Sequence, residues 1–127
     1  MFTRILIVED NTINQLVASH MIENFGLSYE LANNGLEAVD MIKSGKEFAL
    51  VLMDIQMPQL DGIETTKIIR SMEHSVFSKL PIVALTANIS AKDINEYLQV
   101  GMNDFISKPI DKHSFLQKCA SYFISDA

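Results

Sequence analysis

The stretch FALVLMDIQMPQLDG, residues 48–62, decides the fold class of this chain. It opens with the unbroken apolar run Phe48–Met53, reaches Asp54, and then passes through proline, aspartate and glycine, which favour turns. A continuous apolar run of this length is typical of a strand that is covered on both faces of a parallel sheet. Asp61, with a glutamate three residues later, predicts the N-cap of a helix that extends to about Met72. The stretch is therefore interpreted as one buried strand followed by one helix.

The same alternation continues on both sides of this unit. Further strands are predicted at residues 5–8, 29–32, 81–86 and 104–107, and further helices are predicted to begin near Thr12, Asn34, Ser90 and Asp111. The longest connection is expected between Glu73 and Leu80. Strands that alternate with helices form right-handed βαβ units. We therefore expect residues 1–127 to form a single α/β domain with a doubly wound, five-stranded parallel sheet.

The first predicted helix has two distinct sequence signals. Its apolar residues fall on one helical stripe, made up of Ile13, Leu16, Val17, Met21 and Phe25. Thr12 and Gln15 have the spacing of a capping box, in which each side chain accepts or donates at the other's backbone. The pattern predicts a capped amphipathic helix.

Composition excludes several classes of protein. The chain has 127 residues, of which 48% are hydrophobic and 20% charged, as expected for one globular domain. Its formal net charge of −6 argues against direct binding of nucleic acid, because phosphate backbones attract clustered Lys and Arg. The apolar runs are too short to span a bilayer, and the single cysteine, Cys119, excludes an internal disulfide. We expect a cytoplasmic protein without membrane insertion by this chain.

Reactive side chains stand where the predicted strands end. They are Glu9 and Asp10 after the first strand, Asp54 at the third, Thr86 at the fourth, and Lys108 after the fifth. The carboxyl ends of parallel strands meet at one edge of a sheet, so these groups should lie close together. Asp10 alone could merely cap a helix and Asp54 alone could merely end a strand. The joint placement of all five residues favours a functional site.

Three carboxylates at one edge require a cation, because two like charges about 4 Å apart repel by about 4 kcal/mol at an effective dielectric of about 20. Carboxylate oxygens at an open edge suit Mg²⁺, which keeps several waters and also binds phosphate. We predict Asp10 and Asp54 as direct ligands, with Glu9 holding a ligating water. Lys108 would supply a positive charge to phosphate oxygens, and Thr86 a hydroxyl donor. Asp54 is the natural nucleophile, since a carboxylate can form an aspartyl-phosphate.

Five stretches of the sequence resemble, in order, the signature blocks of response-regulator receiver domains. They are Val8–Asn11, Met53–Pro58, Leu60–Gly62, Ala84–Ala87 and Ser107–Pro109. The resemblance covers essentially the whole chain. It implies the flavodoxin-like receiver fold with strand order 2-1-3-4-5, and the transfer of a phosphoryl group to Asp54 from a phosphohistidine on a partner.

The resemblance implies further site features that the residues alone do not indicate. The backbone carbonyl of Gln56 would be the third protein ligand to Mg²⁺, and the Lys108–Pro109 peptide bond would be cis. Gln56 and Asn88 occupy positions that tune dephosphorylation in the family. Many relatives have aspartate at the position of Glu9, and either acid can hold a water.

The resemblance also implies a conformational switch. Phosphate on Asp54 would draw Thr86 inward, and the ring of Phe105 would follow into the vacated space. This movement would remodel the face formed by the fourth helix, the fifth strand and the fifth helix. Many relatives carry tyrosine in place of Phe105, so any role of a phenolic hydroxyl is absent at this position. Without the resemblance, Phe105 would be interpreted as a core residue.

Three stretches that overlap the signature blocks resemble the corresponding stretches of receiver domains attached to hybrid histidine kinases. They are Asp10–Gln15, which includes Asn14, the run Ile55–Pro58, and the run Leu85–Asn88. The implied partners are a sensor histidine kinase, a histidine phosphotransfer domain, or both. The face of the fourth helix, fifth strand and fifth helix could also support a homodimer, and the chain could be the cytoplasmic part of a membrane-bound kinase.

Two other functions compete with signalling. A Mg²⁺-dependent phosphatase would also use an aspartyl-phosphate, but such enzymes commonly carry a second aspartate two residues after the nucleophile, where this chain has Gln56. We therefore expect no turnover of an external substrate. A nucleotide or flavin binder would need a glycine-rich phosphate loop after the first strand, and this sequence has none there. A receiver that acts purely as a scaffold is conceivable, although every expected site residue is present.

Overall fold

The computed structural model describes residues 4–72 and 79–124. Its sheet has five parallel strands in the order β2-β1-β3-β4-β5. The strands are β1 Arg4–Val8, β2 Ser28–Ala32, β3 Leu50–Asp54, β4 Ile82–Thr86 and β5 Asp104–Ser107. The predicted fold class and strand order are confirmed. Most of the predicted connection from Glu73 to Leu80 lies outside the described residues.

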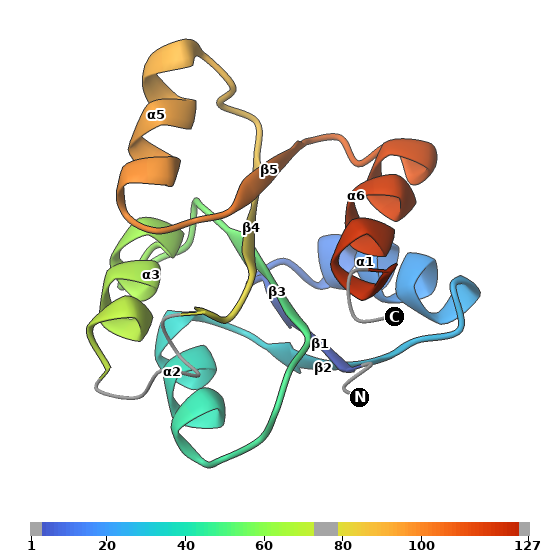
Figure 1. Cartoon of the computed structure of the whole chain (residues 1–127), viewed down its shortest axis with the longest axis horizontal. Coiled ribbons are helices and arrows are strands. Elements are labelled where there is room, and N and C mark those ends of the chain that lie inside the picture. The colour runs from blue at the N-terminus through green and yellow to red at the C-terminus, as the bar shows by residue number, and fades with distance from the viewer. Residues whose placement is uncertain (1–3, 73–78, 125–127) are drawn as a thin grey trace.

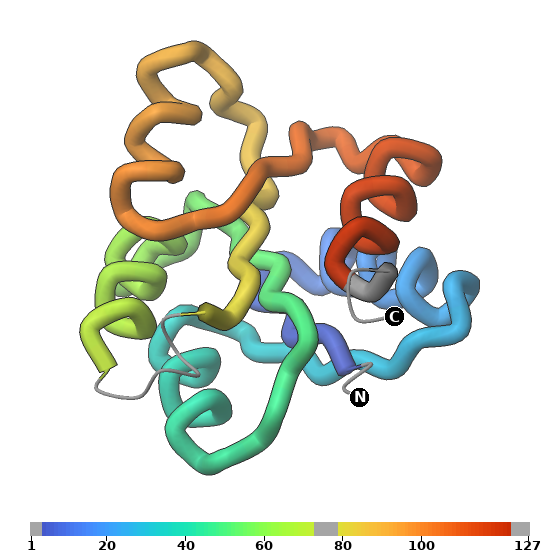
Figure 2. Tube along the Cα trace, in the orientation of Figure 1, coloured from blue at the N-terminus to red at the C-terminus, as the bar shows by residue number. Residues whose placement is uncertain are grey.

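Helices cover both faces of the sheet (Figure 1). They are α1 Thr12–Asn24, α2 Gly35–Lys43, α3 Gly62–Ser71, α5 Ala91–Gln99 and α6 Lys112–Ile124. The helices α1 and α6 lie on one face of the sheet, and α2, α3 and α5 lie on the other (Figure 2). Each of α1, α2, α3 and α5 lies in the chain between two parallel strands. The predicted caps are confirmed, because Asp61, Ser90 and Asp111 accept hydrogen bonds from the backbone N–H three residues later.

The core consists of two clusters, one on each face of the sheet. Every residue of β3 and β4 is buried, as expected for central strands of a parallel sheet. Leu6 and Val8 of β1 pack with the cluster under α2, α3 and α5. Ile5 and Ile7 point to the opposite side, where they join the cluster under α1 and α6. This alternation fixes the strand register, which in turn brings the five strand ends to one edge.

The prediction for the buried face of α1 was wrong. The predicted apolar stripe is largely exposed, with Ile13 70%, Leu16 55% and Val17 39% accessible to solvent. The residues of α1 that face the sheet are instead Gln15, Ala18, Ser19 and Ile22. Two of these four residues, Ala18 and Ser19, have small side chains. Most of the apolar stripe therefore faces outward, whereas Met21 packs against the core cluster on this face of the sheet.

The predicted capping box of α1 was also wrong. The N-cap is Asn11, whose side-chain oxygen accepts a hydrogen bond from the backbone N–H of Asn14 at 3.0 Å. Thr12 is already the first residue of the helix. Gln15 does not complete a capping box, because its side-chain amide points toward the edge of the sheet and donates hydrogen bonds to Glu9 and Asn33.

Candidate functional site

The three predicted carboxylates meet at the carboxyl edge of the sheet. One carboxylate oxygen from each of Glu9, Asp10 and Asp54 lies within 4.8 Å of the others. Glu9 follows β1 and Asp54 is the last residue of β3, and both are buried, whereas Asp10 is exposed. The cluster is therefore closed on the side of the sheet and open on the side of solvent.

Lys108 reaches this cluster from the loop after β5. Its ammonium nitrogen lies 2.9 Å from Oδ1 of Asp54 and 3.2 Å from Oε1 of Glu9. Burial lowers the pKa of Lys108, but the hydrogen bonds and charges of Asp54 and Glu9 outweigh burial and raise it. Lys108 is therefore a fixed positive charge in direct contact with Asp54. The Lys108–Pro109 peptide bond is cis, as the resemblance implies.

Negative charge exceeds positive charge at this edge. Burial and the neighbouring Asp54 carboxylate raise the pKa of Glu9 to about 7, because a buried carboxylate beside another is costly to ionise. Lys108 is the one ammonium that the described contacts bring to these three acids. A cluster of oxygen donors with excess negative charge fits a hard divalent cation such as Mg²⁺. The residues present therefore fit the predicted metal.

Gln15 holds the backbone beside Glu9, a role that the sequence did not reveal. Its side-chain amide donates to the carbonyl oxygen of Glu9 at 2.6 Å and to Oδ1 of Asn33 at 2.8 Å. The backbone N–H of Asn11 donates to the Glu9 carboxylate at 3.2 Å. Gln15 thus ties the loop after β1 to the loop after β2. Its spacing from Thr12 predicts a capping box instead, although a polar residue on the inner face of a helix also fits a buried hydrogen bond.

Asp54 is supported from the loop that follows it. The backbone N–H of Gln56 donates to Oδ1 of Asp54 at 3.3 Å. Gly62, the first residue of α3, donates its N–H to the carbonyl oxygen of Ile55 at 3.0 Å. A Cβ atom at position 62 would collide with the carbonyl oxygen of Asp54. Only glycine lets α3 begin this close to the nucleophile candidate.

Thr86 lies at the same edge of the sheet, but its hydroxyl forms hydrogen bonds with Asn88 and with Tyr97 of α5. The hydroxyl oxygen accepts from the backbone N–H of Asn88 at 2.9 Å and lies 2.9 Å from the hydroxyl oxygen of Tyr97. Tyr97 is buried on α5 and also donates to the carbonyl oxygen of Asn88 at 2.8 Å. No local pattern in the sequence indicates Tyr97, since its contact with Thr86 depends on how α5 packs on the sheet.

A cleft of about 460 Å³ opens between α5 and the loop that directly follows Asp54. Gln56, Pro58 and Asp61 line one wall, and Asn88 and Tyr97 line the other. The structure therefore brings Gln56 and Asn88, the two positions implied to tune dephosphorylation, onto one cleft next to Asp54. Their effect on dephosphorylation stays a prediction.

The chain matches the family model of the response regulator receiver domain over residues 5–120. It belongs to this family. The matched residues include all of the carboxylates together with Thr86, Tyr97 and Lys108. This receiver domain is 43% identical over 122 residues to hybrid signal transduction histidine kinase B of Dictyostelium discoideum, covering 89% of the chain and 6% of that protein. It is 41% identical over 128 residues to the osmosensing histidine protein kinase SLN1 of Saccharomyces cerevisiae, covering 94% of the chain and 10% of SLN1.

The receiver domain thus spans only a small part of these relatives. They confirm the similarity to receivers of hybrid histidine kinases that the motifs indicated.

Two solved receiver domains have the same fold as this chain. One is the receiver domain of Ssk1 from Saccharomyces cerevisiae, crystallised with the histidine phosphotransfer signalling protein Ypd1. It is 36% identical with a TM-score of 0.84, and the match covers 95% of this chain and 88% of that one. The other is the receiver domain of sensor histidine kinase PA1611 from Pseudomonas aeruginosa, with magnesium in its active-site cleft. It is 34% identical with a TM-score of 0.85, and the match covers 96% and 98% of the two chains.

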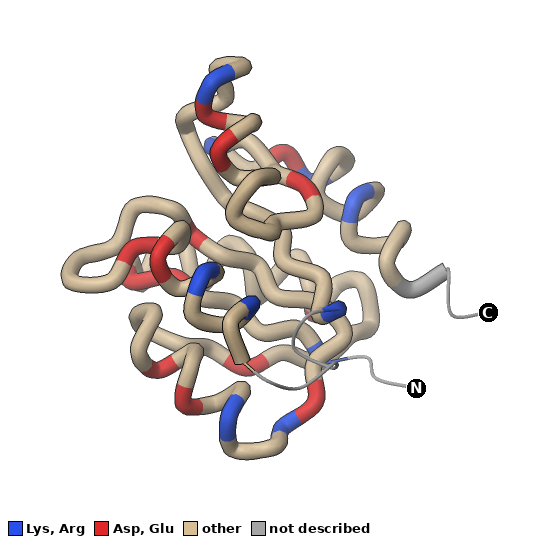
Figure 3. Tube along the Cα trace, turned by 60° about the vertical axis from the view of Figure 1, so that its left-hand side comes forward, with Lys and Arg blue, Asp and Glu red and all other residues tan. Residues whose placement is uncertain are grey.

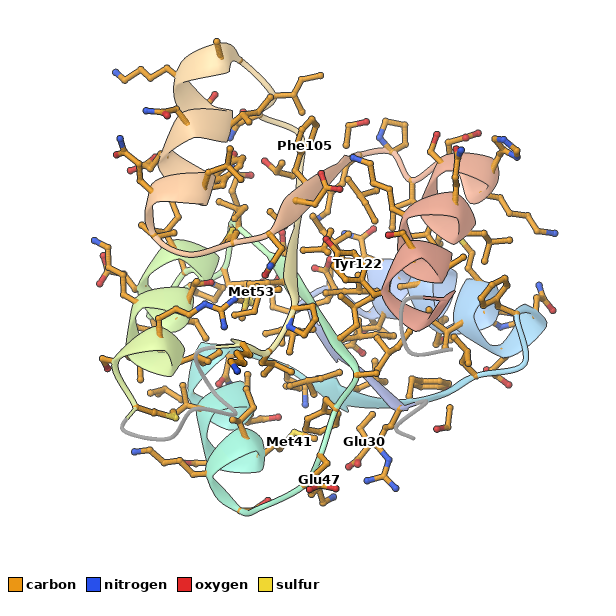
Figure 4. All side chains as sticks on the ribbon, viewed as in Figure 1. Glu30, Met41, Glu47, Met53, Phe105 and Tyr122 are labelled. Atoms are coloured by element: carbon orange, nitrogen blue, oxygen red, sulfur yellow. The ribbon has the colours of Figure 1, made fainter. Side chains whose placement is uncertain are left out.

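Phe105 of the receiver domain lies on β5 between α5 and α6 (Figure 4). It is half-buried, and the ammonium of Lys118 lies 4.3 Å from the centre of its ring. A cation over an aromatic face is attracted by the ring quadrupole. The ring therefore has a partner on α6, while its movement in a switch stays a prediction.

The basic residues of the receiver domain do not gather on one element. Lys and Arg residues are scattered over separate elements (Figure 3). Among the described residues, no helix combines the length and apolar character needed to cross a bilayer.

Proposed function

We propose that this receiver domain accepts a phosphoryl group on Asp54 from a phosphohistidine, in a Mg²⁺-dependent reaction. The observation that carries the proposal is the contact of 2.9 Å between Lys108 and Asp54 inside a cluster of three carboxylates. Of the three acids, Asp54 alone ends the central buried strand, and its contact with the ammonium is shorter than that of Glu9, at 2.9 Å against 3.2 Å. It is therefore the carboxylate best placed to attack an incoming phosphorus.

The reaction needs positioning and charge neutralisation rather than a strong general base. An oxygen of Asp54 forms the new bond to phosphorus while the bond from phosphorus to the histidine nitrogen breaks, and the electron pair stays with the imidazole. Asp10, Asp54 and the backbone carbonyl of Gln56 would hold Mg²⁺, with Glu9 holding one of its waters. The metal would neutralise charge on the phosphoryl oxygens. Lys108 would follow the phosphoryl group, exchanging its contact with Asp54 for one with a phosphoryl oxygen.

Signal output would follow from a change of conformation rather than from turnover of an external substrate. Thr86 would move toward the phosphoryl group, and Phe105 would follow into the space that Thr86 leaves. These movements would alter the face formed by α5, β5 and α6, which are the fourth helix, fifth strand and fifth helix of the sequence prediction. This face would be the contact for a downstream partner or a second copy of the chain.

The exposed apolar stripe of α1 offers a docking surface for the phosphohistidine donor. Ile13 and Leu16 are more than half exposed, which is costly for an isolated domain and typical of an interaction site. A groove joins this stripe to the active site, because Val17 lines it together with Lys108 and Pro109. A donor bound to α1 would thus lie beside Asp54. We propose that the occupant is a histidine phosphotransfer domain, the class of protein that the related Ssk1 receiver binds.

Phosphotransfer from Ypd1, labelled on its histidine, tests this function and its docking surface together. Wild type should take up label, and Asp54→Asn should take up none. Leu16→Glu should slow transfer at least tenfold, because it places a charge in an apolar contact, yet acetyl phosphate should label this variant as fast as wild type.

Leu98→Glu is the matched control, since Leu98 is 51% exposed on α5 and Leu16 is 55% exposed on α1. It should leave transfer unchanged. Equal transfer to the two glutamate variants would contradict docking on α1. A wild-type chain that acetyl phosphate labels and phosphorylated Ypd1 does not would contradict the proposed donor.

A further inference from the structure

We infer that the hydroxyl of Tyr97 holds Thr86 in its unphosphorylated arrangement and thereby couples the phosphorylation site to α5. This inference rests on the proposed function, since it assigns a role to Tyr97 in the response to phosphate. Tyr97 would be a positioning residue, because it acts through Thr86 and touches neither the carboxylates nor the phosphoryl group.

Three hydrogen bonds close a small ring at the end of β4. The hydroxyl of Tyr97 donates to the carbonyl oxygen of Asn88 at 2.8 Å, and the backbone N–H of Asn88 donates to the hydroxyl oxygen of Thr86 at 2.9 Å. The hydroxyl oxygens of Thr86 and Tyr97 lie 2.9 Å apart. The carbonyl oxygen of Asn88 is closer to Tyr97, at 2.8 Å, than to Thr86, at 3.4 Å, which assigns the Tyr97 proton to Asn88. The proton between the two hydroxyls then comes from Thr86.

This assignment creates a competition for Thr86. A threonine hydroxyl has one proton to donate, and in this structure that proton points to Tyr97. Its alternative acceptor, the carbonyl oxygen of Asn88, lies farther away at 3.4 Å. Thr86 can donate to a phosphoryl oxygen on Asp54 only after it releases Tyr97. The phenol therefore opposes the phosphate-bound arrangement.

The same bond connects the site to the helix that carries Tyr97. Among the residues of α5, Tyr97 alone is buried, with 3% of its surface exposed. The hydrogen bonds of its hydroxyl thus anchor α5 to the end of β4. When Thr86 turns to phosphate, this anchor loses one of its two partners and α5 can shift. Tyr97 supplies a phenolic hydroxyl to the switch of a chain whose β5 carries Phe105.

The test is a titration with beryllofluoride in the presence of Mg²⁺, which mimics the phosphoryl group on the aspartate. Tyr97→Phe removes the competing acceptor and keeps the ring, so it should bind beryllofluoride roughly two- to tenfold more tightly than wild type, the net value of one hydrogen bond. The variant should at the same time be less stable to urea than wild type, because Asn88 loses a donor. Tyr29→Phe, at the far edge of the sheet on β2, should leave the affinity unchanged.

The same substitution in a Thr86→Val background isolates the coupling. If Tyr97 acts through the Thr86 hydroxyl, Tyr97→Phe should have no effect on beryllofluoride affinity once that hydroxyl is absent. A purely structural role predicts unchanged or weaker binding by Tyr97→Phe, and that result would overturn the inference. An equal gain in both backgrounds would also overturn it.

Two further results complete the test. If Tyr97→Phe does not fold, hydrogen exchange at the Asn88 amide of wild type tests the inference instead. Beryllofluoride should speed this exchange, because Thr86 then leaves the ring of hydrogen bonds. Unchanged exchange would overturn the inference. Wild type that binds no beryllofluoride would refute the proposed function itself, whereas binding without a Tyr97 effect would refute only this inference.

Discussion

Replacing Glu9 by glutamine should stabilise the metal-free protein, and the gain should increase as the pH rises from 4.5 to about 7. Burial and Asp54 raise the pKa of Glu9 from 4.5 to about 7 in the folded chain. A raised pKa means that the folded state binds the proton more tightly than the unfolded state. The resulting stabilisation is complete below pH 4.5 and disappears as the pH rises through 7. This separation of pKa values corresponds to about 3 kcal/mol.

Glutamine mimics the protonated carboxyl at every pH, so the free-energy advantage of Glu9→Gln over wild type should grow with pH. It should be about 1 kcal/mol at pH 5 and approach about 3 kcal/mol at pH 8. Urea unfolding with EDTA at pH 5, 6.5 and 8 measures it. Glu23→Gln, at the exposed end of α1, removes the same charge from a chain of net charge −6 and serves as control. An advantage that is independent of pH, or that Glu23→Gln shares, would refute this reasoning.

Three further predictions concern the fold around the site. Gly62→Ala should lower the free energy of unfolding by about 1–3 kcal/mol, because its Cβ collides with the carbonyl oxygen of Asp54; unchanged urea unfolding would show that α3 can move away. Phe115 on α6 is fully buried, so Phe115→Ala should cost about 3–5 kcal/mol in the same assay, and a loss under 1 kcal/mol would contradict the assigned core. Burial raises the pKa of the Cys119 thiol to about 12, so iodoacetamide at pH 8 should label the protein only in urea, and rapid labelling of the native chain would contradict this burial.

The parts of the fold that depend on local pattern could be predicted from the sequence. Continuous apolar runs predicted the buried strands, and Asp61, Ser90 and Asp111 predicted helix starts, because an N-cap needs only its own side chain and the next turn. The edge where Glu9, Asp54 and Lys108 meet followed from the rule that parallel strands end together.

The features that were missed depend on contacts between distant elements. An apolar stripe on α1 shows that the helix has two faces, but it does not show which face meets the sheet. Small side chains allowed the other face to pack inward, and Leu16 remained exposed. Gln15 and Tyr97 carry no local signal for their roles, since their partners, Asn33 and Thr86, are brought to them only by the assembled sheet.

Phosphorylation of Asp54 is the central claim, and intact-mass spectrometry after incubation with acetyl phosphate tests it most directly. The account predicts one phosphoryl adduct on wild type in the presence of Mg²⁺, no adduct with EDTA, and no adduct on Asp54→Asn under either condition. An adduct that persists at the wild-type level in Asp54→Asn, or that forms equally well without Mg²⁺, would contradict it.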